Sequence, residues 1–160
     1  MIVIGADLGQ AQDPTALAVA EVHPPEFHVR HLERLPLGMP YPRVVERIAD
    51  LFDKLPDATL VVDATGVGRA VLDQMREAGL EPVPVTITGG RHTSFDGLHW
   101  RVPKQALLRP LVAATEAGRL KVARGTYRKQ MPSCASCRPS RDGLQKAGTL
   151  PLKAWASMMI

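Results

Sequence analysis

The chain has 160 residues, 45% of them apolar and 22% charged, and its 20 Lys+Arg against 16 Asp+Glu give a formal net charge of +4. This composition is typical of one ordinary globular domain, and the length leaves no room for a second full domain. No apolar run approaches the ~18 residues that cross a bilayer, and no basic region followed by a cleavable apolar stretch opens the chain. We therefore expect a cytoplasmic protein without a membrane partner.

The charge is unevenly distributed. Residues 1–100 hold 8 Lys+Arg and 14 Asp+Glu, a net of −6, whereas residues 101–160 hold 12 and 2, a net of +10. The composition also shifts near residue 125, after which Ser, Cys, Arg, Pro and Lys follow one another without periodicity. A basic tail of this kind is typical of proteins with a polyanionic partner.

The first third of the chain predicts three strands and a helix. Residues 2–7, 15–22 and 27–35 are β-prone runs separated by turn residues, which favours an antiparallel meander. Over residues 41–55 the apolar positions recur at intervals of three and four, which predicts an amphipathic helix.

The middle of the chain alternates strands and helices. Residues 58–64 form a nearly all-apolar run, as expected for a parallel strand buried on both faces. A helix over 65–80 follows, with Val71, Leu72 and Met75 on its inward side. The remaining predicted elements are a strand over 83–88, a polar loop over 91–99, a helix over 103–120 and a short strand over 120–123.

The order of these elements restricts the fold class. It predicts an α/β protein with a mixed sheet of about five strands, the first three antiparallel and the later ones parallel, flanked by helices. The sequence contains no G-x-x-x-x-G-K-[ST] segment, which excludes a P-loop nucleotide-binding motor.

Two carboxylates are candidates for a metal site. Asp7 closes the first predicted strand and Asp63 the fourth, so their side chains would converge at one sheet edge if those strands are neighbours. Converging carboxylates suit hard divalent ions such as Mg²⁺ or Mn²⁺, which assist phosphodiester hydrolysis. The alternative is that each Asp caps the turn that follows its strand. Asp13 precedes a proline and is first a turn former, with a supporting acidic role as the alternative.

The histidines have no tight metal-ligand spacing, and we expect surface or packing roles for them. They are His23, His28, His31, His92 and His99.

Three segments together resemble the nuclease domain of the large terminase subunit of tailed bacteriophages. They are IGADLGQAQDPTALAV, VVDATGVGRAVLDQM, and a helix that begins VPKQALLRPLVAA and ends GRLKVA. The similarity covers residues 1 to about 124, and D-A-T-G-V-G is its most specific part. The resemblance implies a ribonuclease H-like fold and a domain that cuts double-stranded DNA during genome packaging.

The resemblance also implies a site and partners. It assigns Asp7 and Asp63 as catalytic metal ligands of a two-ion Mg²⁺ or Mn²⁺ site. Lys104 and Arg91 lie on or before the helix predicted over 103–120, where they could contact the DNA backbone. An ordinary solvated role is the alternative for both cations. The implied partners are a packaging ATPase domain, the portal and the small terminase subunit, in the host cytoplasm of a phage-encoded protein.

The third acidic position of that family, usually within His-Asp-Asp, is missing from the chain. Met158, Met159 and Ile160 are encoded by ATG, ATG and AT-, so a reading frame that takes the third base of each codon with the next two bases spells Asp-Asp there. A Ser157 codon ending in C would complete His-Asp-Asp. The same frame, with permitted third bases, gives an amphipathic helix from Thr126 onward.

We therefore expect residues 1–125 to form the domain and residues 126–160 to be a frameshifted, irregular tail. Under this interpretation the C-x-x-C of Cys134 and Cys137 is accidental, the apolar face left by the missing helix is uncovered, and the cleavage activity is impaired.

Other functions stay open. D-L-G and D-A-T-G-V-G also resemble the phosphate-binding turns of actin-like ATPases and sugar kinases, although those proteins need a duplicated domain. A junction-resolving nuclease of the same fold would be a dimer that prefers branched DNA. A prophage remnant without function is the remaining alternative.

Overall fold

The computed structural model describes residues 1–9, 12–55, 57–66, 69–123 and 127–129. Most of the segment expected to be out of frame, including its two cysteines, therefore lies outside the described residues. Within the described part, no helix is long and apolar enough to cross a membrane.

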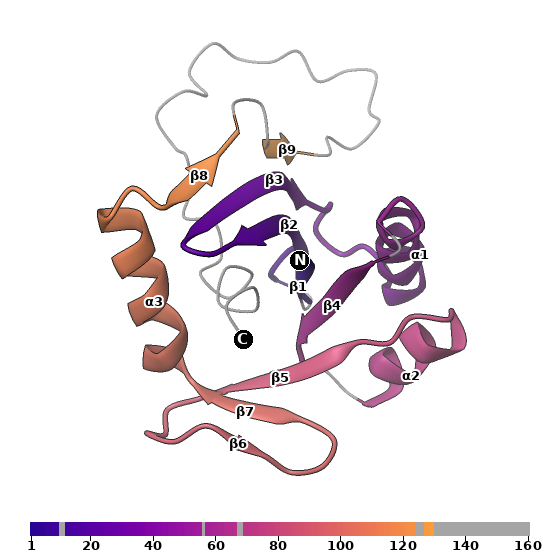
Figure 1. Cartoon of the computed structure of the whole chain (residues 1–160). Helices are drawn as coiled ribbons and strands as arrows, with labels where there is room; N and C mark the ends of the chain where they lie inside the picture. Colours follow the sequence, from indigo (N-terminus) through magenta and orange to yellow (C-terminus); the bar gives the residue numbers. More distant parts are fainter. Residues whose placement is uncertain (10–11, 56, 67–68, 124–126, 130–160) are drawn as a thin grey trace.

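The described strands form one mixed sheet in the order β6-β7-β5-β4-β1-β2-β3-β8, with β9 also paired to β3 (Figure 1). The first three strands are an antiparallel meander, whereas β4, β5 and β7 continue the sheet parallel to β1. This change from antiparallel to parallel pairing confirms the predicted fold class, although the described sheet has nine strands and not about five. The strands are β1 (Ile2–Asp7), β2 (Ala16–His23), β3 (Glu26–Arg34), β4 (Ala58–Asp63), β5 (Val83–Thr88), β6 (Ser94–Phe95), β7 (Trp100–Pro103), β8 (Leu120–Val122) and β9 (Tyr127–Lys129).

Helices cover both faces of the sheet. Figure 1 shows α1 (Tyr41–Phe52) and α2 (Arg69–Glu77) on one side and α3 (Lys104–Glu116) on the other. The inward residues predicted for α2 are buried, and Gly79, with a φ of +77°, follows the end of that helix.

The central strands β1 and β4 contribute alternate side chains to two apolar cores. Ile4 and Leu60 pack in the core on the side of α1 and α2. Val3 and Val61 pack in the second core, together with Leu107 of α3. Because both faces are buried, these strands are apolar at nearly every position until each ends in an aspartate.

The structure differs from the sequence prediction over residues 91–99, which were expected to be a polar loop. Ser94–Phe95 and Trp100–Pro103 pair as the antiparallel strands β6 and β7, and β7 joins the sheet parallel to β5. Every residue from 91 to 98 is exposed, so no burial pattern marks a strand there. These short strands depend on the edge that β5 offers, which a local pattern does not reveal.

A buried ion pair ties α1 to the sheet. Glu33 of β3 is 1% exposed, and its carboxylate accepts hydrogen bonds from Arg47 of α1 at 2.7 Å and from the His31 ring at 3.1 Å. Burial raises the pKa of Glu33, but the hydrogen bonds from His31 and Arg47 outweigh this effect and lower the pKa to about 2. Glu33 therefore stays ionised in the folded protein at neutral and mildly acidic pH.

Replacing Arg47 by Met leaves this buried carboxylate without its main partner, so we expect the free energy of unfolding at neutral pH to fall by roughly 3 kcal/mol. The folded pKa of Glu33 lies below its ordinary value of 4.5. The stabilisation is therefore complete above that value and is lost as the pH falls toward the folded pKa. Urea denaturation at a series of pH values measures both effects.

The control is Arg43→Met on the same helix. Both side chains of the Arg43–Glu46 pair are exposed, so this pair contributes less than ~0.5 kcal/mol to the free energy of unfolding. Equal losses in the two variants would contradict this role of the Glu33–Arg47 pair.

Candidate functional site

Asp7 and Asp63 lie directly opposite each other at the ends of two neighbouring parallel strands. The register pairs Asp7 of β1 with Asp63 of β4, as it pairs Val3 with Thr59 and Gly5 with Val61. Neighbouring strands are about 4.8 Å apart, and opposite residues of parallel strands project from the same face. The structure thus brings together the two carboxylates that the sequence singled out.

The two carboxylates differ in exposure. Asp63 is 2% exposed, whereas Asp7 is partly buried. A buried carboxylate requires compensation by hydrogen bonds or by a cation. Two adjacent carboxylates offer hard oxygen ligands, so this donor set fits Mg²⁺ or Mn²⁺.

The turn after β4 fixes one oxygen of Asp63. The backbone N–H of Thr65 donates to Oδ1 of Asp63 at 2.8 Å. The backbone N–H of Ala64 donates to the carbonyl of Val85 at 2.8 Å, which continues the pairing with β5. Gly66 then adopts a φ of +76°, a conformation that favours glycine. The turn-capping role considered as the alternative for Asp63 is therefore present at one of its two oxygens.

Gly9, just after β1, lies tightly against residues 13–15. The backbone N–H of Gly9 donates to Oγ1 of Thr15 at 3.1 Å, and the Tyr41 hydroxyl donates to the carbonyl of Gly9 at 3.2 Å. A Cβ atom at Gly9 would lie 2.0 Å from the carbonyl oxygen of Asp13, so only glycine fits there. Asp13 itself is exposed and lines a pocket of about 380 Å³ together with Gly9, Thr15 and Tyr41.

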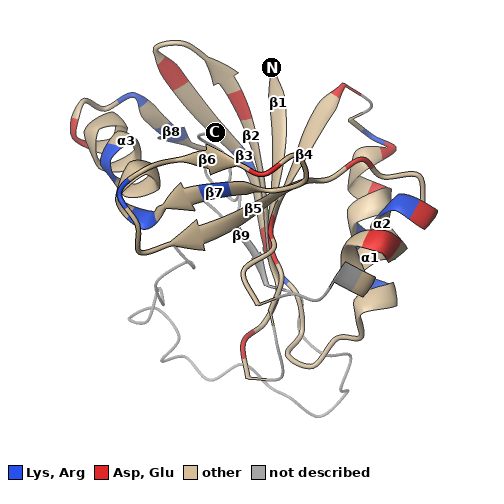
Figure 2. Ribbon diagram, turned by 90° about the horizontal axis from the view of Figure 1, so that it is seen from below, with Lys and Arg blue, Asp and Glu red and all other residues tan. Residues whose placement is uncertain are grey.

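Arg91 and Lys104 lie beyond the same edge of the sheet. β5 and β7 run parallel to β4, so their C-terminal ends point the same way as Asp63. Arg91 is in the loop that follows β5, and Lys104 is the first residue of α3, directly after β7. Both are exposed, and Figure 2 shows basic residues on α3 and β7.

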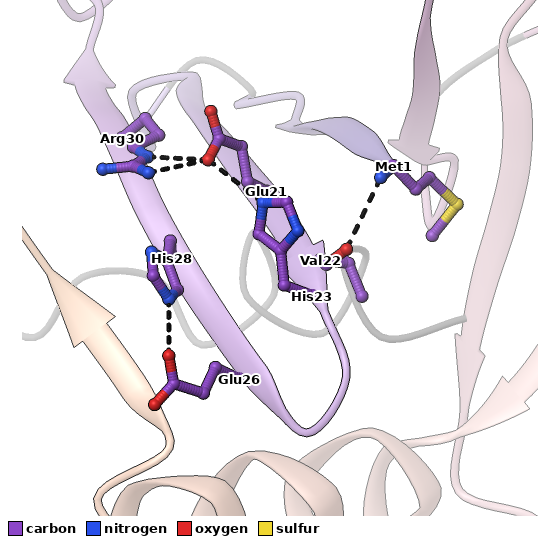
Figure 3. A network of polar contacts seen from close by, with 7 residues as sticks. All are labelled: Met1, Glu21, Val22, His23, Glu26, His28 and Arg30. Atoms are coloured by element: carbon purple, nitrogen blue, oxygen red, sulfur yellow. Dashed lines mark hydrogen bonds and ion pairs between the residues drawn. The ribbon is translucent and has the colours of Figure 1, made fainter.

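Three of the histidines bond to glutamates of the β2–β3 hairpin. Figure 3 shows His28 beside Glu26 at 2.9 Å and His23 beside Glu21 at 3.4 Å, with Arg30 also on Glu21. The hydrogen bond from Arg30 lowers the pKa of Glu21. His31 makes the bond to the buried Glu33 described above. Across the residues that the structure describes, no group of three or more His, Cys, Asp and Glu side chains could hold a metal ion.

Sequence reasoning missed the two threonines that support the candidate site, Thr15 and Thr65. The position of Thr65, two residues after an aspartate, is a signal for an Asx turn and could have identified one of them. The bond between Thr15 and Gly9 spans six residues and has no such local signal.

The chain is similar to solved structures of large terminase nucleases. The nuclease of thermophilic phage G20c is 23% identical over 76% of this chain and 57% of its own, with a TM-score of 0.58, and has been solved with bound cobalt, zinc and magnesium. The manganese-soaked terminase nuclease domain of human cytomegalovirus is 11% identical over 81% of this chain and 67% of its own, with a TM-score of 0.55.

The large terminase of a second thermophilic bacteriophage is 9% identical, with a TM-score of 0.56, over 77% of this chain and 28% of its own. The match to the G20c nuclease covers less than two thirds of that protein's length. No family model matches the sequence, and no curated protein matches it either. The structural likeness shows that the chain has the ribonuclease H-like fold of large terminase nuclease domains, as its sequence motifs predicted.

Proposed function

We propose that the chain is the nuclease domain of a phage packaging terminase, a metal-dependent hydrolase of phosphodiester bonds in double-stranded DNA. The observation that carries the proposal is the register of β1 and β4, which sets Asp7 beside Asp63 at one edge and on one face of the sheet. The fold shared with terminase nucleases, one of them solved with bound magnesium, supports it.

In this proposal Asp7 and Asp63 hold Mg²⁺ or Mn²⁺. When bound, the ions supply an activated water and stabilise the leaving oxygen of the cleaved bond. The protein's own contribution at Asp63 is the Thr65 amide, which holds one carboxylate oxygen in place. Side chains that are already oriented lose little entropy when they bind a cation.

Arg91 and Lys104 are the proposed contacts to the DNA backbone. β5 and β7 are the first and second strands beyond β4, so the chain leaves the sheet about 5 and 10 Å from the strand that carries Asp63. Exposed cations beyond that edge would bind phosphates and position the duplex without reading its sequence. The wider partners proposed are a packaging ATPase domain, the portal and the small terminase subunit, in the host cytoplasm.

We further propose that residues 126–160 are translated out of frame and that the chain lacks its third carboxylate. The support is the composition change near residue 125 and the two Asp codons that the final methionines force in the shifted frame. Of this segment the structure describes Tyr127–Lys129, as strand β9. A site with two of three ligands should hold its second ion weakly, which would impair cleavage.

Metal binding by the purified chain tests the site. We expect Mn²⁺ to bind in isothermal titration calorimetry. Loss of an outer-shell partner costs about 10–100-fold in metal affinity, and Asp7→Asn and Asp63→Asn should each weaken the Mn²⁺ affinity by more than that. Asp13→Asn, on the exposed loop, is the control and should bind as the wild type does. Unchanged binding in Asp7→Asn or Asp63→Asn would rule out this site.

Plasmid cleavage tests the missing carboxylate. With Mn²⁺ we expect activity near background, because a site with two of three carboxylates holds its second ion weakly. Nucleotide sequencing of the gene from near codon 125 should find a frame that continues past His-Asp-Asp into a helix. Robust nicking that Asp7→Ala abolishes would refute the impaired activity, and a gene without that frame would refute the frameshift.

A further inference from the structure

We propose that Thr65 is a positioning residue, which fixes the Asp63 carboxylate relative to β5. The inference rests on the proposed metal site and adds a residue to it. Thr65 follows the end of β4 by two positions and makes two hydrogen bonds with different partners, one through its backbone and one through its side chain.

The side-chain bond lies just beyond the last paired residues of β4 and β5. β4 and β5 pair through Asp63 and Val85, after which the Ala64 amide still donates to the Val85 carbonyl. The register of β4 with β5 ends at Asp63 and Val85. At that point Oγ1 of Thr65 accepts the backbone N–H of Ile87 at 2.8 Å. The hydroxyl therefore extends the pairing of the two strands beyond the last residue of β4.

The backbone bond transmits this attachment to the carboxylate. The N–H of Thr65 donates to Oδ1 of Asp63 at 2.8 Å, so the position of the Thr65 backbone sets the direction of that oxygen. If Thr65 were released from β5, the turn and the carboxylate could move together. Its neighbour Gly66, with a φ of +76°, allows the chain to leave the sheet at once.

The bond between Thr65 and β5 also links the proposed metal ligand Asp63 to the proposed DNA contact Arg91. β5 lies next to β4 in the sheet, and the loop that carries Arg91 begins at its end (Figure 1). Ile87, whose amide bonds to Thr65, is one residue from the end of that strand. Thr65 thus fixes the carboxylate relative to the strand from which the proposed DNA contact emerges.

The test compares three variants of the full chain. Thr65→Val removes the hydroxyl at nearly constant volume, Thr65→Ser keeps it, and Thr59→Val makes the same change at an exposed position of β4. Because outer-shell partners are worth about 10–100-fold in metal affinity, Mn²⁺ affinity should fall at least about tenfold in Thr65→Val. Thr65→Ser and Thr59→Val should stay close to the wild type. If Thr65→Val does not fold, Thr65→Ala replaces it.

Amide hydrogen exchange supplies a second readout that needs no metal. Without the hydroxyl, the amides of Ile87 and Thr65 should exchange faster, whereas Thr59→Val should leave both unchanged. Wild-type Mn²⁺ affinity in Thr65→Val overturns the positioning role and leaves the proposed function intact. A wild-type chain that binds no Mn²⁺ overturns the proposed function. In that case unchanged exchange in Thr65→Val overturns the attachment to β5 as well, and faster exchange upholds it.

Discussion

The parallel pairing of β1 with β4 is the constraint on which the rest of the structure depends. It joins the antiparallel meander to the parallel half of the sheet, and its register sets two aspartates opposite each other. Burial on both faces leaves few positions on these strands where a charge is tolerated, and the end of each strand is one of them. A shift of one residue would turn Asp7 to the opposite face from Asp63.

The proposed nucleic-acid binding is supported by the position of charged residues at that edge of the sheet, and not by the overall charge of the chain. Residues 1–125 hold 14 Lys+Arg and 15 Asp+Glu, a net of −1, so the basic character of the chain belongs to its last 35 residues, 126–160. If those residues are out of frame, their charge says nothing about function. The carboxylates then support the proposed DNA binding, together with the cations Arg91 and Lys104, which lie beyond the same edge.

The fold and the carboxylate pair could be predicted because they leave local signals. An apolar run that ends in aspartate marks β1 and β4, and three-to-four spacing marks the buried face of α1. The contacts of Glu33 with Arg47 and of Thr65 with Ile87 could not be predicted, since they join residues 14 and 22 positions apart. The strands β6 and β7 were missed for a related reason, because the edge of β5 stabilises them.

The most direct test of the proposed site is a crystal of this chain soaked in manganese chloride and measured for anomalous scattering. We predict a peak in contact with the carboxylates of both Asp7 and Asp63, at the shared edge of β1 and β4. A peak that contacts neither aspartate, or no peak at a concentration that saturates the protein in solution, would contradict the assignment of these residues as metal ligands.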